Sequence, residues 1–402
     1  MLDADEEARY LSTARAVRER CSRLHGLAQE GKLDHWTLDE QRLPEIAAYV
    51  AKVTRDAHPD VQAIPYHGRY RHFSAGGVDR LATLEQRWRE LSSDERLMSA
   101  FELVITSVLL DAGAGTEWSY RDADGRTYSR SEGLAVASFD WFSSGGLSDD
   151  ADAPLSVGTR ALQSVTPATL GAAFQVSERN PLLGLDGRAS LLRRLGEAVR
   201  ASPAYFGEQP RLGHFALALR RHASGGALPA PSLLTAVLEA FGQIWPGRET
   251  LAGRPLGDVW WHPRAGRVPF HKLSQWLSYS LCEPLEAAGV RVVALNELTG
   301  LAEYRNGGLF VDGGALVPKR PGILGASHLV SSEVVVEWRA LTVCLLDRLA
   351  EQVRERLGLS DDELPLVRVL EGGTWRAGRS LAANARPGAV PPLSIESDGT
   401  VF

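Results

Sequence analysis

The stretch of residues 257–319 constrains the fold most strongly, because it contains the clearest amphipathic helix pattern in the chain. Apolar residues recur there at the spacing of one helical face, and such a face must pack against other elements. Pro284 is expected to kink or end this helix, and Gly289 to stop it before a short strand at 290–295. The positions on the face are Leu273, Trp276, Leu277, Ser280, Leu281, Pro284 and Leu285.

The segment after that strand, residues 303–312, carries polar groups that do not build a core. Two interpretations are open. The Asn-Gly pair at 306–307 is a strong hairpin turn signal, and its neighbours would then be ordinary strand ends. Alternatively, the polar side chains line a binding site. Those side chains are Glu303, Tyr304, Arg305, Asn306 and Asp312.

Composition limits the classes of partner. With 402 residues and 44% hydrophobic content, the chain can bury a large core. Its formal net charge of −6 provides no basic field for a nucleic-acid backbone, although a local basic pocket for one phosphate stays open. We therefore expect no nucleic-acid partner.

The cysteines and the apolar runs indicate a cytoplasmic protein. The three cysteines, Cys21, Cys282 and Cys344, are far apart and odd in number, which is typical of free thiols in a reducing compartment. They show no zinc spacing, and we expect neither a metal nor a cofactor. We expect no signal peptide, because the first residues are acidic, and no apolar run reaches membrane-spanning length. We expect no membrane partner.

A loop at residues 64–73 concentrates cations and aromatic residues before a pair of glycines. Arg69, Arg71 and His72 would suit an anionic ligand such as a phosphate or a carboxylate. The alternative is a solvated surface loop.

Residues 118–130 read as a short β-hairpin, and an apolar helix follows it. Arg130 and Glu132 lie at the start of that helix. The free backbone N–H groups there, beside a cation, form a candidate substrate site. Asp140 and Trp141, further along the helix, are also candidates. The competing interpretation is that Ser131 simply caps the helix. The glycine-rich segment 143–154 is then either an internal domain boundary or a lid.

Two C-terminal segments place charges among apolar residues. Glu337 and Arg339 interrupt a buried helix at 333–350, where they form either a structural pair or a cavity wall. Glu371 precedes two glycines and the aromatic Trp375. This segment again combines a carboxylate, glycines that allow close approach of the backbone, and an aromatic ring for stacking. The residues after Pro391 and Pro392 are expected to form an extended tail that docks.

The fold class expected from these patterns is mainly α. We predict one compact helical unit over residues 1–402, with small β-hairpins near 118–130 and 290–317.

Several of these segments resemble the uracil-catabolism protein four family. The likeness rests on VPFHKLSQW at 268–276, residues 298–312, VVEWRALT at 335–342 and VLEGGTWRAG at 369–378, and it extends from Tyr10 to Phe402. The resemblance implies a place beside a uracil phosphoribosyltransferase and a ring-opening enzyme similar to GTP cyclohydrolase, in a pathway that passes through a ribosylated urea.

That pathway suggests hydrolysis of the N-glycosidic bond of ribosylurea or its 5-phosphate. Glu303 would stabilise the ribosyl cation and Asp312 would position water, by analogy with glycoside hydrolysis. Arg69, Arg71 and His72 would hold the phosphate. Glu303-Tyr304-Arg305 also resembles the Asp-Tyr-Arg segment of queuosine-salvage N-glycosyl hydrolases. Further substrate-binding candidates are Arg130, Glu132, Asp140, Trp141, His271, Tyr304, Arg305, Asn306, Arg339, Glu371 and Trp375.

Two alternatives remain open at this stage. One is an amide or urea-bond hydrolase acting on an open-ring pyrimidine product, although His262 and His271 lack a third partner at metal spacing. The other is a non-catalytic partner of the ring-opening enzyme, which would show an exposed apolar patch. The sequence does not specify the oligomeric state.

Overall fold

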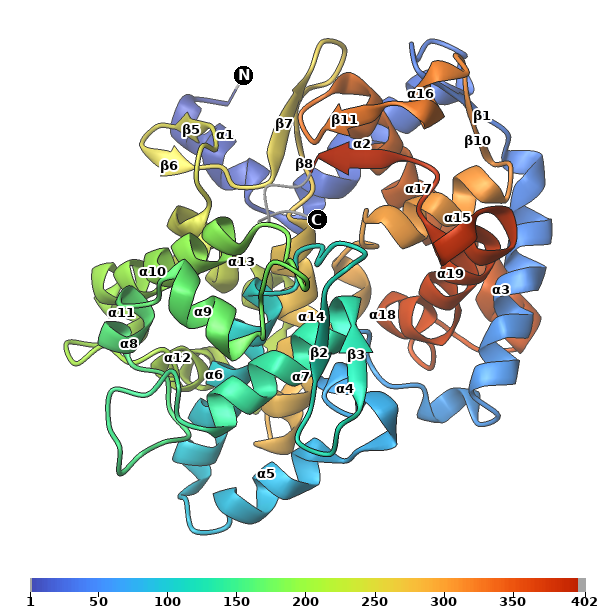
Figure 1. Ribbon diagram of the computed structural model, residues 1–402. Coiled ribbons are helices and arrows are strands. Elements are labelled where there is room, and N and C mark those ends of the chain that lie inside the picture. The colour runs from blue at the N-terminus through green and yellow to red at the C-terminus, as the bar shows by residue number, and fades with distance from the viewer. Residues whose placement is uncertain (1, 397–402) are drawn as a thin grey trace. The chain divides into compact units, whose positions relative to one another are not determined.

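The computed structural model describes residues 2–396, and its fold is mainly α, as the sequence predicts (Figure 1). The chain forms two compact units. The first unit comprises residues 2–67, 248–275 and 294–396, and the second comprises residues 68–247 and 276–293. The loop 143–154 lies inside the second unit, and its role as a lid stays a prediction. In the described part of the chain, no helix is both long and apolar enough to cross a bilayer.

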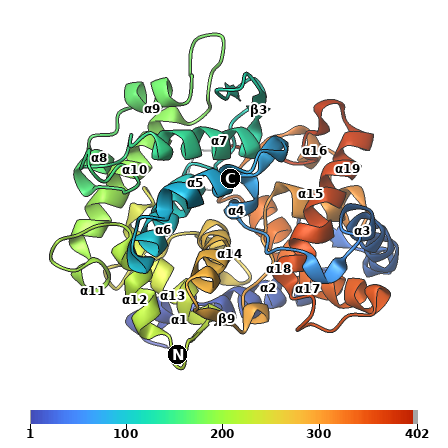
Figure 2. The same ribbon diagram turned by 90° about the horizontal axis from the view of Figure 1, so that it is seen from below.

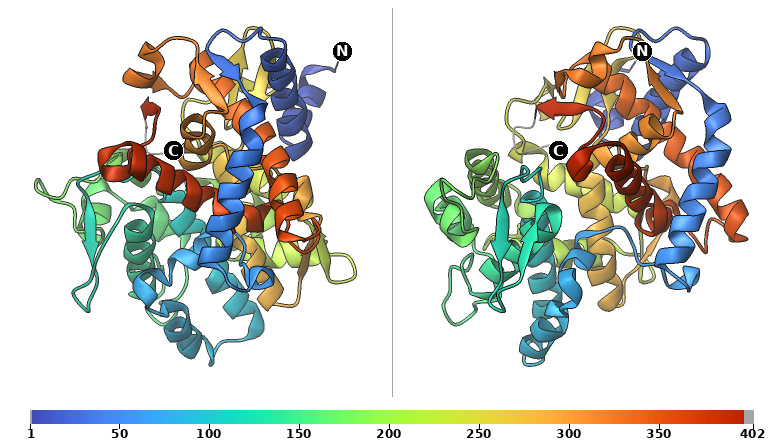
Figure 3. Two further views of the ribbon diagram at one scale, coloured as in Figure 1. Left: turned by 90° about the vertical axis from the view of Figure 1, so that its right-hand side faces the viewer. Right: turned by 45° about the vertical axis from the view of Figure 1, so that its right-hand side comes forward.

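The first unit is organised around α17 (Glu333–Leu357), a helix of 25 residues that packs against α2, α3 and α15. Figure 3 shows α3, in blue, beside the orange and red C-terminal helices. Its helices are α1 (Ala4–Leu11), α2 (Ala14–Gln29), α3 (Leu43–Ala57), α15 (Tyr304–Asp312), α16 (Gly322–Gly325), α17, α18 (Leu366–Val369) and α19 (Trp375–Ala385). Its strands are β1 (Trp36–Leu38), β5 (Thr250–Leu251), β6 (Arg254–Pro255), β7 (Val259–His262), β8 (Gly266–Pro269), β10 (Leu316–Pro318), β11 (Ser327–Leu329) and β12 (Ser394–Glu396).

The second unit is built around α6 (Ser93–Leu109), which is buried over nearly its whole length after the N-cap Ser92 and packs against α7 and α12. The other helices are α4 (Arg69–His72), α5 (Arg80–Trp88), α7 (Arg130–Ser143), α8 (Thr159–Gln163), α9 (Pro167–Ala173), α10 (Leu185–Ala201), α11 (Pro203–Phe206), α12 (His214–His222) and α13 (Ala230–Phe241). Its strands are β2 (Ser119–Arg121), β3 (Thr127–Ser129), β4 (Ala227–Pro229) and β9 (Arg291–Val293).

One of the two expected hairpins is found. Strands β2 and β3 pair antiparallel, with Tyr120 opposite Tyr128, which confirms the hairpin near 118–130. The hairpin expected near 290–317 is wrong. Instead, β9 pairs parallel with β4, and β10 pairs antiparallel with β1. The segment between β9 and β10 folds as a helix, so these strands take partners that are distant in sequence.

The amphipathic helix expected at 273–285 is α14 (Lys272–Ala287). Pro284 lies inside this helix and does not end it, because the residues that follow complete the last turn. Gly289 then adopts a φ of 82°, the left-handed conformation expected of a helix stop.

The tail after Pro392 is extended where it is described. Strand β12 pairs parallel with β11, with Ile395 opposite His328. The rest of the expected tail, residues 397–402, lies outside the described residues.

Candidate functional site

The polar segment at 303–312 is a helix, so the predicted turn at 306–307 is wrong. Glu303 is the N-cap of α15, and its carboxylate accepts hydrogen bonds from the backbone N–H of Asn306 at 2.6 Å and of Arg305 at 2.7 Å. These are two of the unsatisfied donors that every helix N-terminus exposes. A carboxylate is also favoured there by the helix dipole.

Gly307 serves close packing in α15 and not a turn. A Cβ atom at this position would lie 2.3 Å from Cζ2 of Trp338 on α17. The indole of Trp338 also donates a hydrogen bond of 3.2 Å to the Gly307 carbonyl oxygen. Helix α15 therefore approaches α17 at a distance that only glycine permits, and this contact fixes the position of Glu303.

Glu303 is 5% exposed, and burial raises the pKa of its carboxyl group above the ordinary value. Lys272, the two backbone N–H groups and His67 act in the opposite sense and favour the ionised form. The site therefore holds a buried carboxylate at a helix N-terminus, under the electrostatic influence of two basic side chains. This combination of desolvation and specific charges is typical of functional sites.

Glu371 belongs to the same unit and lies on a π-helical turn, Leu370–Thr374. Short π-helical turns are rare and frequently occur at functional sites. Its carboxylate accepts a hydrogen bond of 2.8 Å from Nδ1 of His67. A Cβ atom at Gly373 would lie 2.4 Å from Oγ1 of Thr54, so the turn packs directly on α3.

Asn306 connects the turn of Glu371 to the start of α15. Thr374 donates a hydrogen bond of 2.8 Å to the side-chain oxygen of Asn306, whose amide nitrogen donates to the carbonyl of Leu301. Helix α15 also lies beside α19 (Figures 1 and 2). The structure thus brings together the segments of Glu303 and Glu371, and it adds His67 and Lys272, which the sequence interpretation left out of the site.

Asp312 does not join this cluster. It is the last residue of α15, about 13 Å along the helix axis from Glu303 at 1.5 Å per residue. Both of its oxygens are bound by Arg386, at 2.8 and 2.6 Å. Carboxylate pairs that act on one glycosidic bond stand about 5–10 Å apart. The geometry therefore does not support Asp312 as the partner of Glu303.

Arg339 forms a structural ion pair, and its partner is Asp258. The guanidinium binds both carboxylate oxygens at 2.7 Å and lies 4.1 Å from the centre of the Phe270 ring. Burial would raise the pKa of Asp258, but Arg339 and hydrogen bonds from Lys272 N–H and Trp260 hold it well below its ordinary value. The pair fixes the backbone N–H of Lys272, at 3.0 Å, at the start of α14.

Glu337, two residues before Arg339, has a different partner. Its carboxylate accepts hydrogen bonds from the backbone N–H groups of Asp34 at 3.2 Å and His35 at 3.1 Å. It is fully buried, with Nε2 of His262 at 3.5 Å. Glu337 therefore holds the turn before β1 and takes no part in the cluster around Glu303.

His271 forms a hydrogen bond within the core, and its role in substrate binding stays a prediction. Its Nε2 donates to the carbonyl oxygen of Leu11 at 2.8 Å, and its backbone adopts a strained φ of 47° just before α14. Burial lowers the pKa of the imidazole, so the ring is neutral near pH 7.

The remaining candidates of the first unit flank this core. Arg305 lies over the ring of Tyr304 at 5.0 Å and donates to the carbonyl of Ala389 at 2.7 Å. Trp375 follows the π-helical turn and carries Arg379 over its ring at 5.7 Å. Their roles in substrate binding stay predictions.

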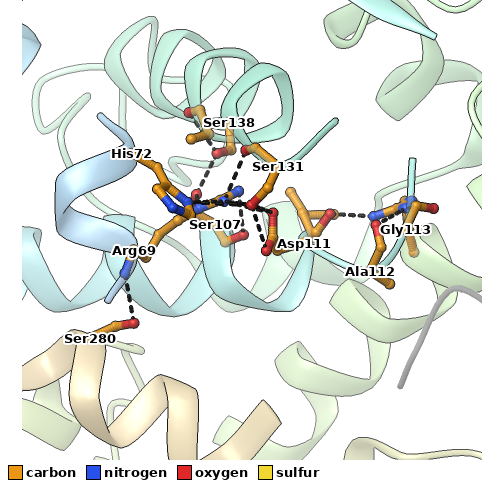
Figure 4. Close-up of polar contacts among 12 residues, drawn as sticks. Arg69, His72, Ser107, Asp111, Ala112, Gly113, Ser131, Ser138 and Ser280 are labelled. Atoms are coloured by element: carbon orange, nitrogen blue, oxygen red, sulfur yellow. Dashed lines mark hydrogen bonds and ion pairs between the residues drawn. The ribbon is translucent and has the colours of Figure 1, made fainter. Parts of the chain in front are cut away.

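In the second unit, Arg69 is fully buried at the centre of a polar cluster (Figure 4). Its guanidinium donates to Ser107 Oγ at 2.6 Å, to Asp111 at 2.6 Å and to the carbonyl of Ser131 at 3.1 Å. Ser131 also donates to Asp111 at 2.6 Å. Because these neighbours occupy the guanidinium from several sides, Arg69 is committed to holding the fold, and the geometry does not support its role as a phosphate ligand.

The two other residues of the expected anion loop differ from Arg69. Arg71 is 47% exposed and pairs with Glu283 at 2.8 Å. Nδ1 of His72 lies 3.3 Å from both Arg69 Nη1 and Ser131 Oγ, and its ring lies 6.0 Å from that of Trp276. The expectation that this loop shares a pocket with Glu303 stays a prediction.

Around the start of α7, Ser131 is not the helix cap. The N-cap position is Ser129, without a side-chain hydrogen bond, and Arg130 follows with a left-handed φ of 54°. Further along, Asp140 accepts a hydrogen bond from Tyr120 at 2.9 Å, and burial raises the pKa of its carboxyl group. The ring of Trp141 packs edge-on against Phe174. Glu132, in the first turn, stays a predicted substrate ligand.

Metal-ligating residues are not grouped in residues 2–396, where no set of three or more histidine, cysteine, aspartate or glutamate side chains is placed to hold an ion. The cysteines at 21, 282 and 344 are free thiols.

Comparison with known proteins places the whole chain in one family. Residues 10–402 match the family model described as "Protein of unknown function (DUF1688)". The chain is 40% identical to protein urg3 of Schizosaccharomyces pombe over 407 residues, which cover 99% of each chain. It is 34% identical to uracil catabolism protein 4 of Lachancea kluyveri over 442 residues, which cover 100% of each chain. The resemblance inferred from the motifs is confirmed, and the chain belongs to the family of uracil catabolism protein 4.

Proposed function

We propose that this protein is an enzyme of uracil catabolism that hydrolyses the N-glycosidic bond of ribosylurea or of its 5-phosphate and releases urea. The name of the relative from Lachancea kluyveri supports the pathway. The cluster around Glu303 supports the reaction type. The substrate is a small molecule of the ribosyl or phosphoribosyl urea class.

The observation that carries the proposal is the environment of Glu303. Cleavage of an N-glycosidic bond passes through a ribosyl state with oxocarbenium character, which a fixed negative charge in a dry site stabilises. The Glu303 carboxylate is buried and held by two backbone N–H groups, so it needs little reorganisation to meet such a charge. Lys272 and His67 keep the ionised form accessible despite the burial.

Lys272 fits the same chemistry. Its backbone is fixed by Asp258, and its ammonium group acts on the Glu303 carboxylate from the start of α14. A cation in that position would also favour a urea oxygen that gains negative charge as the bond breaks. In this proposal Glu303 stabilises the positive charge on the ribosyl group, and Lys272 stabilises the negative charge on the departing urea.

The test is a product analysis with purified protein. Ribosylurea and its 5-phosphate are offered separately, and urea and the free sugar are measured. We expect urea and ribose, or ribose 5-phosphate, in equal amounts. Ammonia without free urea would instead support an amide or urea-bond hydrolase, and no turnover of either compound would support a non-catalytic partner of the ring-opening enzyme.

Two matched variants separate chemistry from folding. Glu303→Gln removes the charge from a buried carboxylate that accepts two backbone hydrogen bonds. Glu337→Gln makes the same change in a carboxylate with the same kind of partners outside the cluster. We expect loss of urea release in the first variant only. Equal activity of the two variants would remove Glu303 from the reaction.

A further inference from the structure

The sequence interpretation assigned the positioning of water to Asp312, but the geometry of α15 does not support that role. The group that activates water is therefore not yet identified. Hydrolysis needs a group that accepts a proton from the attacking water. The hydrogen bond between His67 and Glu371 lies in the same unit as Glu303, and the bond between Thr374 and Asn306 joins the turn of Glu371 to the helix that Glu303 caps.

The hydrogen bond fixes the tautomer of His67. Its Nδ1 lies 2.8 Å from a carboxylate oxygen of Glu371, and a carboxylate can only accept, so Nδ1 carries the proton. In the neutral ring Nε2 then holds a lone pair. This atom forms no hydrogen bond with any residue of the described chain, 2–396. The imidazole therefore offers a basic nitrogen that no other side chain of residues 2–396 binds.

The backbone holds both partners in place. The N–H of His67 donates to the carbonyl of Val367 at 3.2 Å, which ties the loop to α18. Glu371 is directed by the π-helical turn, whose glycines pack on Ile64, Thr54 and Val50. The two side chains are only 9% and 14% exposed, so the pair is shielded from bulk water.

We propose that His67 is the general base of the hydrolysis and that Glu371 positions it, an inference that rests on the proposed function. Nε2 of His67 removes a proton from water, and the water oxygen bonds to C1 of the ribosyl group. The C1–N bond breaks, and its electron pair stays on the urea nitrogen. The imidazolium then returns the proton to that nitrogen, which gives neutral urea and restores His67. Glu371 stabilises the imidazolium between these two transfers.

The experiment compares His67→Ala with His25→Ala. His25 is also a buried histidine bonded to a carboxylate, Glu40, at 2.9 Å, so the two substitutions remove similar interactions. We expect His67→Ala to release urea at least about 100-fold more slowly than wild type, the lower range for general base catalysis. We expect His25→Ala to change stability without this loss. Added imidazole should restore part of the activity of His67→Ala, because a small base can occupy the space of the missing ring.

A second variant, Glu371→Gln, provides a readout that a merely structural role would not move. Without the carboxylate the imidazolium loses its charge partner, so kcat should fall while KM for ribosylurea stays nearly unchanged. Urea release by wild type together with near-normal turnover of His67→Ala would overturn the base assignment and leave the proposed function standing. An unfolded His67→Ala with an unchanged kcat in Glu371→Gln would also overturn it. No urea from wild type would reject both proposals.

Discussion

Thr374 donates a hydrogen bond of 2.8 Å to the side-chain oxygen of Asn306, and this bond joins the first turn of α15 to the π-helical turn of Glu371. Asn306 is also one of the two residues whose backbone N–H groups bind the Glu303 carboxylate. One buried amide therefore connects the cap of α15 with the segment that positions His67. This connection links the segments that carry residues 303 and 371, and residue 371 binds His67.

The kinetic effect of Glu303→Gln should fall on turnover. Glutamine keeps the size of the side chain and an oxygen acceptor but removes the charge that matters chiefly in the transition state. We expect kcat to fall about 100-fold or more, on the order of 3 kcal/mol of transition-state stabilisation, with little change in KM. Steady-state kinetics of urea release measures both constants. A rise in KM with unchanged kcat would assign Glu303 to ground-state binding.

The same substitution should increase stability at neutral pH. Because burial raises the folded-state pKa of Glu303, its favourable contribution is present below the unfolded pKa and is lost as the pH rises through the folded value. Ionised Glu303 therefore costs stability near pH 7, and neutral glutamine does not. We expect Glu303→Gln to melt at a higher temperature than wild type at pH 7, with the difference shrinking toward pH 4. A variant that melts lower than wild type at pH 7 would show that the N-cap bonds outweigh the burial.

The two ion pairs of the first unit should differ in strength. Asp258→Asn leaves the fully buried guanidinium of Arg339 without its charge partner, which typically costs about 3–5 kcal/mol. Asp312→Asn removes a pair in which Arg386 is 28% exposed, so we expect about 1 kcal/mol. Chemical denaturation measures both values.

Since the pKa of Asp258 is depressed, the contribution of its pair is present at neutral pH and is lost only as the pH falls below the ordinary range of aspartate.

Activity of the Asp312→Asn variant tests whether Asp312 takes part in the reaction. Asp312 lies at the far end of α15 from Glu303, so we expect turnover to stay within about threefold of wild type, a change of less than 1 kcal/mol in the barrier. A loss as large as that of Glu303→Gln, in a variant that melts normally, would restore the original two-carboxylate interpretation.

Packing of α15 on α17 should not tolerate a side chain at Gly307. Gly307→Ala places a Cβ atom 2.3 Å from the Trp338 ring, and overpacking of this kind costs about 1–3 kcal/mol. Gly26→Ala is the control, because Gly26 lies inside α2 with nothing within 4 Å of the added atom. It should stabilise the protein by about 0.5–1 kcal/mol. Equal melting temperatures for the two variants would mean that α15 shifts freely.

Local patterns predicted the helices better than they predicted the site. The apolar spacing of α14 is a short-range signal, and this helix is found where expected. The Asn-Gly pair at 306–307 misled because glutamate is an uncommon N-cap and because Gly307 is required by a tertiary contact. Short-range turn chemistry cannot reveal such a contact.

Charge partners were the least predictable feature. Arg339 is 81 residues from Asp258 in sequence, and Arg69 is 42 residues from Asp111. A buried charge indicates that a partner exists, but only the fold selects which one. His67 and its partner Glu371 are 304 residues apart in sequence.

The role of Arg69 gives the last prediction. If its guanidinium holds the fold, Arg69→Lys should destabilise the protein by several kcal/mol, because one ammonium group cannot reach Ser107, Asp111 and Ser131 together. Arg71→Lys is the matched control: its side chain is 47% exposed, so the change should stay within about 0.5 kcal/mol. Denaturation of both variants measures the difference.

The alternative is that Arg69 binds the substrate phosphate. In that case Arg69→Lys would raise KM for the 5-phosphate of ribosylurea and leave KM for ribosylurea itself unchanged. A stable Arg69→Lys variant with that selective loss would make Arg69 a phosphate ligand after all.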